Sequence, residues 1–211
     1  IETAGSLNIL FTDKTGTLTG GNLRVMSQIG ANGKEYRGIY DLKSAPGLLE
    51  WTTLSGFYNT VSTVSNGKAL GGNATDRALL DYLLPVKKNP PPYEIRGTFP
   101  FSSASKYSPA CIHGEKGKFT LWKGAPEKLL SRCKRCFDPD GNILPFHSMP
   151  AVRQKWQEMT TRAIRVILLA VSEGELPSQP GEDLIFIGLI GIRDQLRPEV
   201  KKAVELVRGA G

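Results

Sequence analysis

The sequence has little cysteine, no long apolar run and no low-complexity composition. Three Cys in 211 residues argue against a disulfide framework and favour a reducing, cytoplasmic compartment. The longest apolar stretch, residues 184–192, is far shorter than the roughly 18 residues that a membrane-spanning helix needs. Residues 1–6 lack a basic segment followed by an apolar one, so we expect no signal peptide. These absences exclude transmembrane, collagen-like, coiled-coil and disulfide-stapled chains and predict a soluble globular one.

The charge balance is moderately positive, with 27 Lys and Arg against 20 Asp and Glu. Such a balance suits either nucleic acid or a phosphorylated ligand. The basic residues are scattered in short pairs, and no basic stripe alternates with aromatic residues. We therefore expect a solvated basic surface and no nucleic-acid partner.

Cys133 and Cys136 form a C-x-x-C pair. A zinc site would have to be completed by Cys111, His113 or His147, whose spacings are unfavourable for one. The favoured interpretation is an incidental thiol pair on a turn.

The two ends of the chain resemble each other in pattern. Residues 7–11 predict a buried strand that leads directly into a polar loop beginning at Asp13, and open α/β sheets place reactive loops at such strand ends. Residues 184–192 predict a second buried strand, followed by a loop and by a helix that Pro198 opens. That helix has one apolar face, so the C-terminal end reads as half of a βαβ unit.

The middle of the chain predicts a largely antiparallel sheet with helices between its strands. Asn32-Gly33 is a hairpin signal, and residues 114–118 predict a second turn between strands. A helix is expected from Asp76 to Leu84 with Thr75 as its cap. The other predicted helices are 48–58, 126–133 and 150–162.

Asp13 opens the string Asp-Lys-Thr-Gly-Thr-Leu-Thr, which ends at Thr19. A carboxylate at a strand end, beside a turn whose amides and hydroxyls can surround a phosphate, has the polarity of a nucleophile that attacks phosphorus. From the residues alone an ordinary turn remains the commoner explanation. The string resembles the phosphorylation motif of P-type ion-transporting ATPases, and that resemblance favours catalysis.

Further segments follow that family's order along nearly the whole chain. Residues 72–79 resemble the segment whose acidic residue faces adenine, and 101–106 the adenine-stacking segment. Residues 123–127, Lys-Gly-Ala-Pro-Glu, match the family's nucleotide-domain signature. Residues 161–170 resemble the arginine segment near the nucleotide phosphates, and residues 194–200 resemble the hinge segment that leads back into the phosphorylation domain. The nucleotide-binding residues that this resemblance implies are Asp76, Phe101, Lys106, Lys123, Gly124, Arg165, Asp194 and Arg197.

The resemblance implies ATP and Mg²⁺ as cofactors and aspartyl phosphate on Asp13 as intermediate. Lys14 and Thr17 are expected to steady the charge, and Asp13 with the Thr15 main-chain carbonyl to hold Mg²⁺. The implied fold class is α/β: an α+β nucleotide-binding domain at 25–182, with incomplete Rossmann-like phosphorylation-domain segments at 1–24 and 183–211.

Departures from the family pattern suggest a fragment. Ser103 stands where members often carry a phosphate-anchoring Arg, and the family's Thr-Gly-Asp and Gly-Asp-Gly-x-Asn-Asp segments do not follow Gly211. We expect the fragment alone to be soluble and inactive, with partners in the remaining phosphorylation, actuator and transmembrane domains of a multi-pass membrane protein. Its apolar end strands also predict self-association.

Other functional classes remain to be weighed. A haloacid-dehalogenase-type phosphatase would carry a second Asp at the position of Thr15, as general acid and base. A regulatory nucleotide-binding module would not need Asp13, and a P-loop kinase is excluded because its glycine-rich string is absent. The motifs are closest to the calcium-pump and sodium-potassium-pump branch. Calcium is the favoured ion, although membrane residues would decide it.

Overall fold

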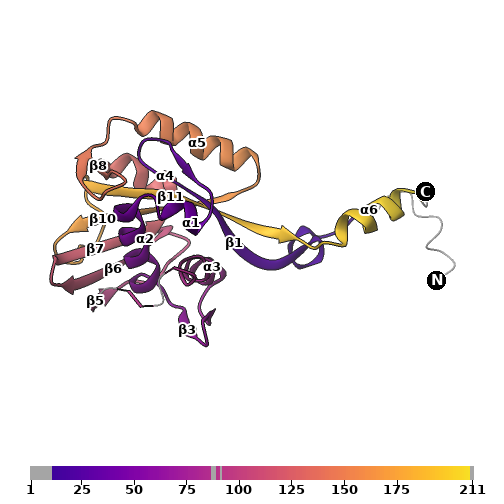
Figure 1. The fold of residues 1–211 in the computed structure, drawn as a ribbon, viewed down its shortest axis with the longest axis horizontal. Helices are drawn as coiled ribbons and strands as arrows, with labels where there is room; N and C mark the ends of the chain where they lie inside the picture. Colours follow the sequence, from indigo (N-terminus) through magenta and orange to yellow (C-terminus); the bar gives the residue numbers. More distant parts are fainter. Residues whose placement is uncertain (1–10, 87–88, 91, 210–211) are drawn as a thin grey trace. The chain divides into compact units, whose positions relative to one another are not determined.

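The computed structural model describes residues 11–86, 89–90 and 92–209, which fall into two compact units (Figure 1). The larger unit is Arg24–Arg193, and the smaller one combines Ile1–Leu23 with Asp194–Gly211. Within the described ranges, no helix has both the length and the apolar character that a membrane span requires.

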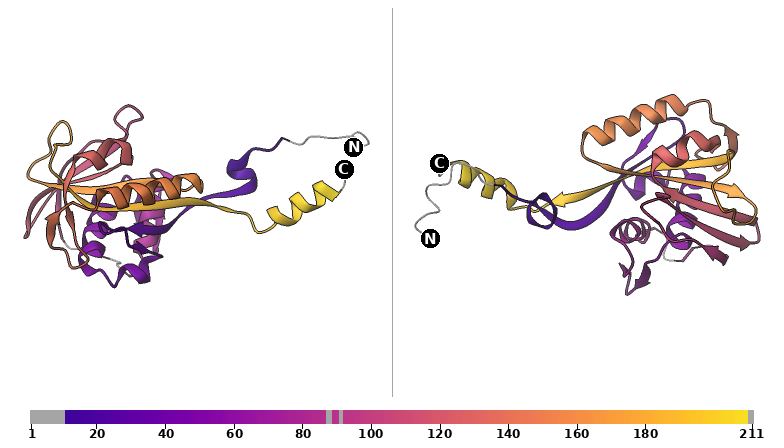
Figure 2. Two further views of the ribbon diagram at one scale, coloured as in Figure 1. Left: turned by 90° about the horizontal axis from the view of Figure 1, so that it is seen from above. Right: turned by 180° about the vertical axis from the view of Figure 1, so that it is seen from behind.

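A large, mostly antiparallel sheet forms the centre of the larger unit. Its strand order is β2-β1-β11-β10-β7-β6-β5, with β8 next to β11 and β9 next to β8. β8 pairs with β11 in parallel, whereas the pairs β1–β2, β10–β11, β7–β10, β5–β6, β6–β7 and β8–β9 are antiparallel. Figure 2 shows β10 and β11 running side by side. The strands are β1 (Thr19–Ile29), β2 (Glu35–Tyr36), β5 (Glu94–Thr98), β6 (Tyr107–Gly114), β7 (Gly117–Gly124), β8 (Cys133–Phe137), β9 (Ile143–Pro145), β10 (Arg165–Glu173) and β11 (Leu184–Leu196).

Helices and a small hairpin surround this sheet. α2 packs against β7 and against α3, while α5 packs against β10. Proline in the first turn begins α2, α4 and α5, a position where its missing N–H costs nothing. The elements are α1 (Ile39–Leu42), α2 (Pro46–Tyr58), the hairpin β3 (Thr63–Ser65) and β4 (Lys68–Leu70), α3 (Ala74–Leu83), α4 (Pro126–Leu129), the 3₁₀ turn Leu130–Arg132 and α5 (Met149–Thr161).

Three local expectations need correction. The cap of α3 is Asn73, whose side chain accepts the Asp76 N–H at 2.9 Å, and Thr75 already lies inside the helix. The helix expected over 126–133 ends early. Cys133 and Cys136 lie on β8, not on a turn, because this segment pairs with the buried strand β11.

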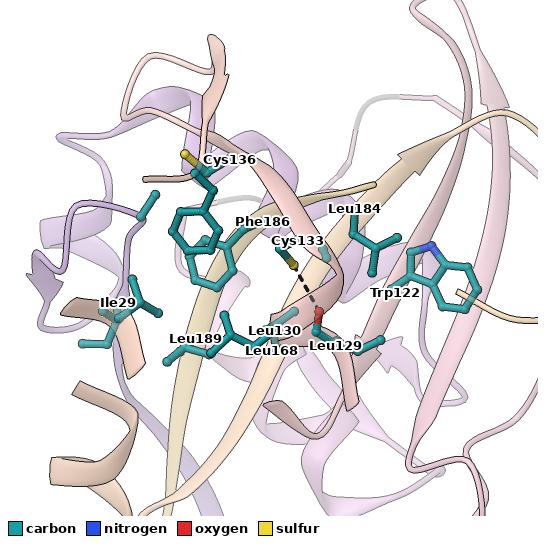
Figure 3. Close-up of a cluster of buried hydrophobic side chains, with 14 of the residues drawn as sticks. Ile29, Trp122, Leu129, Leu130, Cys133, Cys136, Leu168, Leu184, Phe186 and Leu189 are labelled. Carbon is teal, nitrogen blue, oxygen red and sulfur yellow. Dashed lines mark hydrogen bonds between the residues drawn. The ribbon is translucent and has the colours of Figure 1, made fainter. Parts of the chain in front are cut away.

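The core lies around β11, whose residues from Leu184 to Ile192 are all buried. This continuous apolar run was predicted as a buried strand, and the sheet places it between β10 and β1. In Figure 3, Phe186 and Leu189 of β11 lie among residues from β7, β8 and α4. Cys133 donates its S–H to the Leu129 carbonyl at 3.3 Å, and all three thiols of the chain are free and buried.

The boundary at 183, from which the sequence analysis expected a phosphorylation-domain segment, stays a prediction. In the structure, residues 183–193 lie in the compact unit Arg24–Arg193. The reason is their pairing with β10 and β8, both of which are strands of that unit. A Rossmann-like part is not shown: the smaller unit's described residues form a π-helical turn (Lys14–Leu18), strand ends and α6 (Val200–Gly209). The strand expected at 7–11 lies, except for Phe11, outside the described residues.

Candidate functional site

A cavity of about 700 Å³ opens within the larger unit, at one end of the β6–β7 hairpin. It lies where the last residues of β5 and β7, the first residues of β10, and the start of α3 converge. Its lining consists of 59–61, 73–76, 98–101, Ser108, 123–125 and 165–167. A concave site of this size is suited to a small organic ligand.

Lys123 lies buried in the wall of this cavity. Its ammonium group lies 2.6 Å from a carboxylate oxygen of Asp76 and also donates to the main-chain carbonyl of Asn59. The Lys123 and Asp76 side chains are only 8% and 4% exposed, so this is an ion pair taken almost entirely out of water. Burial lowers the pKa of Lys123, while the charge of Asp76 opposes that shift.

Two further hydrogen bonds hold Asp76. Its second carboxylate oxygen accepts the Val61 N–H at 3.0 Å, and its main-chain N–H donates to the side-chain oxygen of Asn73 at 2.9 Å. Both oxygens thus have partners inside the protein. Each can still accept a further hydrogen bond, because a carboxylate offers about four lone-pair positions. Asp76 therefore lines the cavity and also anchors its only buried cation among the described residues.

Asn59 is a structural part of the site that the sequence analysis missed. Its side-chain amide donates to the carbonyls of Ser108 and Leu121 at 2.7 and 3.0 Å, and its amide oxygen accepts the Ser108 hydroxyl at 3.1 Å. These bonds tie the C-terminus of α2 to β6 and β7, while the Asn59 carbonyl receives Lys123. An Asn following a predicted helix is a common pattern, and it carried no signal of this role.

Two aromatic rings stand at the cavity with large exposed fractions. Phe101, predicted as a stacking residue, is 56% exposed, and Phe99, which sequence reasoning did not select, is 52% exposed. The Phe99 N–H donates to the Pro109 carbonyl at 3.1 Å, which holds this segment beside β6. Exposed apolar rings at a mostly apolar cavity are suited to stack on a flat heteroaromatic ligand.

The close packing of β6 against β7 explains why the Lys-Gly-Ala-Pro-Glu segment has a glycine at position 124. A Cβ atom there would lie 2.5 Å from the Cβ of Tyr107 and 2.6 Å from the Lys106 carbonyl oxygen. Only glycine permits β6 to approach β7 this closely at the cavity. Arg165, also predicted, lines the cavity as the first residue of β10, and its side chain is exposed.

Lys106 lies outside the lining of the cavity. Its ammonium group forms an exposed ion pair with Glu127 at 3.1 Å. Its backbone has the left-handed conformation, with φ 60°, and bonds to Ser102 and Ala125 at 2.8 and 2.9 Å. The pKa of Glu127 lies below its usual range, because its carboxylate accepts a hydrogen bond from the Glu127 main-chain N–H and another from Lys106. These bonds outweigh the partial desolvation of the carboxylate. Lys106 shapes the loop beside the cavity.

In the smaller unit, Asp194 and Arg197 support the turn that follows Asp13. Arg197 donates from its guanidinium to the carbonyls of Gly16 at 2.9 Å and Thr19 at 3.3 Å. The Thr19 hydroxyl donates to Asp194 at 2.5 Å and accepts the Gly16 N–H. Neither Asp194 nor Arg197 lines the cavity of the larger unit.

Asp13 has an exposed side chain, and the π-helical turn Lys14–Leu18 follows it directly. Thr17 in that turn is also exposed, and Lys14 and Thr15 contribute its first backbone units. An exposed carboxylate beside main-chain carbonyls offers the hard oxygen ligands that Mg²⁺ prefers, so the donor chemistry of Asp13 and Thr15 fits that ion. The predicted residues thus form two groups, one in each unit.

Known proteins provide an independent comparison. A family model described as "P-type ATPase, cytoplasmic domain N" matches residues 51–199, which include every segment of the cavity. Over its whole length the chain is 30% identical to calcium-transporting ATPase 8, plasma membrane-type, of Arabidopsis thaliana. It is 32% identical to calcium-transporting ATPase PAT1 of Dictyostelium discoideum and 28% identical to plasma membrane calcium-transporting ATPase 3 of Homo sapiens.

The chain spans about a fifth of the length of these relatives: 21%, 20% and 19% respectively. The family model covers more than half of the chain and contains the cavity, its buried lysine and its exposed aromatic rings. The chain belongs to the P-type ATPase family, with the cytoplasmic domain N as its matched part.

Proposed function

We propose that the larger unit binds ATP in its cavity and that the intact protein uses this ATP to transport cations, with calcium favoured. The observation that carries the proposal is the cavity itself, which combines exposed Phe99 and Phe101 with buried Lys123 and the guanidinium of Arg165. Aromatic rings suit the adenine base, and cations suit the phosphates. The calcium preference rests on the names of the relatives.

In the proposed reaction, a carboxylate oxygen of Asp13 attacks the γ-phosphorus of ATP. The bond from that phosphorus to the β–γ bridging oxygen breaks, ADP leaves with the electron pair, and an acyl phosphate remains on Asp13. Mg²⁺ at Asp13 and the Thr15 carbonyl would neutralise charge on the transferred group. Lys14 and Thr17 would steady that charge. Arg197 and Asp194 act as positioning residues, because they hold the turn that follows the nucleophile.

The sequence at Thr15 separates this proposal from a phosphatase. A phosphatase of the haloacid-dehalogenase type needs a carboxylate there to activate water, and a hydroxyl side chain has no such basicity. A lasting acyl phosphate suits a pump. The test uses the intact protein: Asp13→Asn should abolish acid-stable labelling from radioactive ATP and ATP-driven calcium uptake into vesicles. Uptake that persists in this variant would refute the proposed mechanism.

Nucleotide binding by the chain itself provides a separate test. AMP, ADP and ATP should bind within about tenfold of one another, because Asp13 is not part of the cavity and the base supplies much of the affinity. GTP should bind more weakly. Stacking contributes about 1 to 3 kcal/mol, so Phe101→Ala should weaken ATP binding about fivefold or more, whereas Asp13→Ala should leave it nearly unchanged. Calorimetric titration measures both, and an indifferent Phe101 would contradict the base-centred arrangement.

A further inference from the structure

Cys111, His113 and Glu175 bring three different metal-binding side chains together away from the nucleotide cavity. Their ligand atoms all lie within 4.8 Å of one another. One carboxylate oxygen of Glu175 lies 3.8 Å from the Cys111 sulfur and 3.2 Å from Nε2 of His113. None of the three lines the cavity, which lies at the far end of the β6–β7 hairpin from the turn 114–117.

Strand geometry explains two of the three positions. Cys111 and His113 are two residues apart on β6, so both side chains project from the same face of the sheet. Cys111 is buried, and the His113 side chain is 21% exposed, so the pair extends from the protein interior to the surface.

The loop that follows β10 positions Glu175, the third side chain of this cluster. Gly174, at φ 97°, donates its N–H to the Lys118 carbonyl at 2.9 Å and accepts the Thr120 hydroxyl at 3.3 Å. These bonds fix the loop against β7, and Glu175 follows at once. Lys118 also binds one oxygen of Glu175 at 2.7 Å, which leaves the other oxygen facing Cys111 and His113.

The distances between these atoms fit a single small ion. Zinc bonds measure about 2.3 Å to sulfur and about 2.0 to 2.2 Å to nitrogen or oxygen. At tetrahedral angles, such bonds separate sulfur from oxygen by about 3.6 Å and nitrogen from oxygen by about 3.4 Å. The two separations from the Glu175 oxygen, 3.8 Å to sulfur and 3.2 Å to nitrogen, are within a few tenths of an ångström of these values. The Cys111 sulfur and the His113 nitrogen lie within 4.8 Å of each other, so rotation of these side chains would bring all three onto one ion.

We propose that Cys111, His113 and Glu175 form a binding site for a divalent transition metal ion, with zinc preferred. Thiolate and imidazole favour zinc over calcium and magnesium, which require oxygen ligands. On binding, the S–H bond of Cys111 breaks, the sulfur–metal bond forms, and the proton passes to the solvent. Three protein ligands leave the fourth position to water. The sequence analysis considered zinc only around Cys133 and Cys136, because Glu175 lies far from Cys111 in the chain.

The experiment uses the chain without a polyhistidine tag, with its thiols reduced by a non-chelating phosphine. Zn²⁺ affinity is measured by competition with a chromophoric chelator, and Co²⁺ serves as the spectroscopic probe. We expect one Zn²⁺ per chain, not displaced by excess Ca²⁺ or Mg²⁺. His113→Ala should weaken Zn²⁺ binding by more than about tenfold, since even the loss of an outer partner costs 10- to 100-fold. The matched control His147→Ala, at an exposed histidine, should bind as the unmodified chain does.

Co²⁺ identifies the sulfur ligand. A thiolate-to-cobalt charge-transfer band in the near ultraviolet should appear with the unmodified chain and with Cys136→Ser, and be absent from Cys111→Ser. If Cys111→Ser does not fold, Glu175→Gln and His113→Ala decide the question through Zn²⁺ affinity. Equal affinity in the unmodified chain and His113→Ala would overturn the proposal. So would a charge-transfer band that requires Cys136.

Discussion

Among single residues, Lys123 is both a cation available to a ligand and a partner in a buried ion pair. As a cation in the cavity wall it is available to a phosphate, yet its ammonium group is already bound by Asp76 and the Asn59 carbonyl. A buried ion pair is weak evidence of net stability, but removal of one partner leaves the other charge buried and uncompensated. Lys123 therefore couples the stability of the larger unit to the chemistry of its cavity.

Lys123→Met should destabilise the chain by about 3 to 5 kcal/mol, because the carboxylate of Asp76 would remain buried without its cation. Urea unfolding followed by circular dichroism at low temperature measures this loss. The control is the double variant Lys123→Met, Asp76→Asn, which removes both charges and keeps an acceptor for the Val61 N–H. It should recover part of the stability. A single variant as stable as the unmodified chain would show that the pair carries no such coupling.

The hairpin β8–β9 shows how a turn element can depend on charge. Its loop runs from Asp138 to Asn142, and one Asp138 oxygen accepts the N–H groups of Asp140 and Asn142 at 2.9 and 2.8 Å. The other oxygen accepts the Asn142 side-chain amide at 2.9 Å. This last bond is the main reason that the pKa of Asp138 lies below its ordinary value of 3.8, and the main-chain bonds add to it.

A lowered folded-state pKa means that the ionised Asp138 adds stability at pH values above about 4, and that this stability is lost as the pH falls through the folded-state value. Asp138→Asn should therefore lower Tm at pH 6 and approach the unmodified chain near pH 2. The effect should be small, because the side chain is only partly buried. Scanning calorimetry from pH 2 to 7 measures it. Asp140→Asn is the control, because it removes a charge from the same loop without altering these acceptor oxygens. A difference in Tm between the unmodified chain and Asp138→Asn that does not change with pH would contradict the argument.

Elements with a strong local signal could be predicted from the sequence. The apolar run 184–192 and the turns near Asn32-Gly33 and 114–118 carry their structure in adjacent residues, and both turns join strands as predicted, although β2 ends at Tyr36 and Ile39 begins α1. The partners of those strands could not be read in this way. β11 pairs with β10 and with β8 from much earlier in the chain, and this pairing places 184–193 in the larger unit.

The residues of the candidate site also fall into those with a local sequence signal and those placed by long-range packing. Motif residues with their own local pattern, such as Lys123, Gly124 and Phe101, lie at the cavity. The contacts of Asn59 and Lys106 have no such local pattern, because packing decides their partners. Asn59 bonds to Ser108, 49 residues away, and Lys106 to Glu127, 21 residues away. No spacing rule connects residues across such distances. The roles of Asp13 and Arg197 in phosphoryl transfer stay predictions.

At the scale of the whole molecule, every residue that lines the cavity belongs to Arg24–Arg193. The buried core cluster around β11 also lies in that range. By contrast, α6 in the smaller unit has no buried residues, and its Leu206 and Val207 are 65% and 51% exposed. The nucleotide cavity and the core that supports it therefore use one unit alone.

A chain of residues 24–193 should consequently fold on its own and bind AMP within about twofold of the affinity of the 211-residue chain, a difference of roughly 0.4 kcal/mol. It loses no cavity residue and no member of the core cluster, although β1 and β11 become shorter at their outer ends. Calorimetric titration with AMP, beside thermal unfolding of both chains, makes the comparison. The shorter chain should also lose exposed apolar surface from α6 and be the more monodisperse in light scattering. A folded 24–193 chain that has lost AMP affinity would show that nucleotide binding needs the smaller unit.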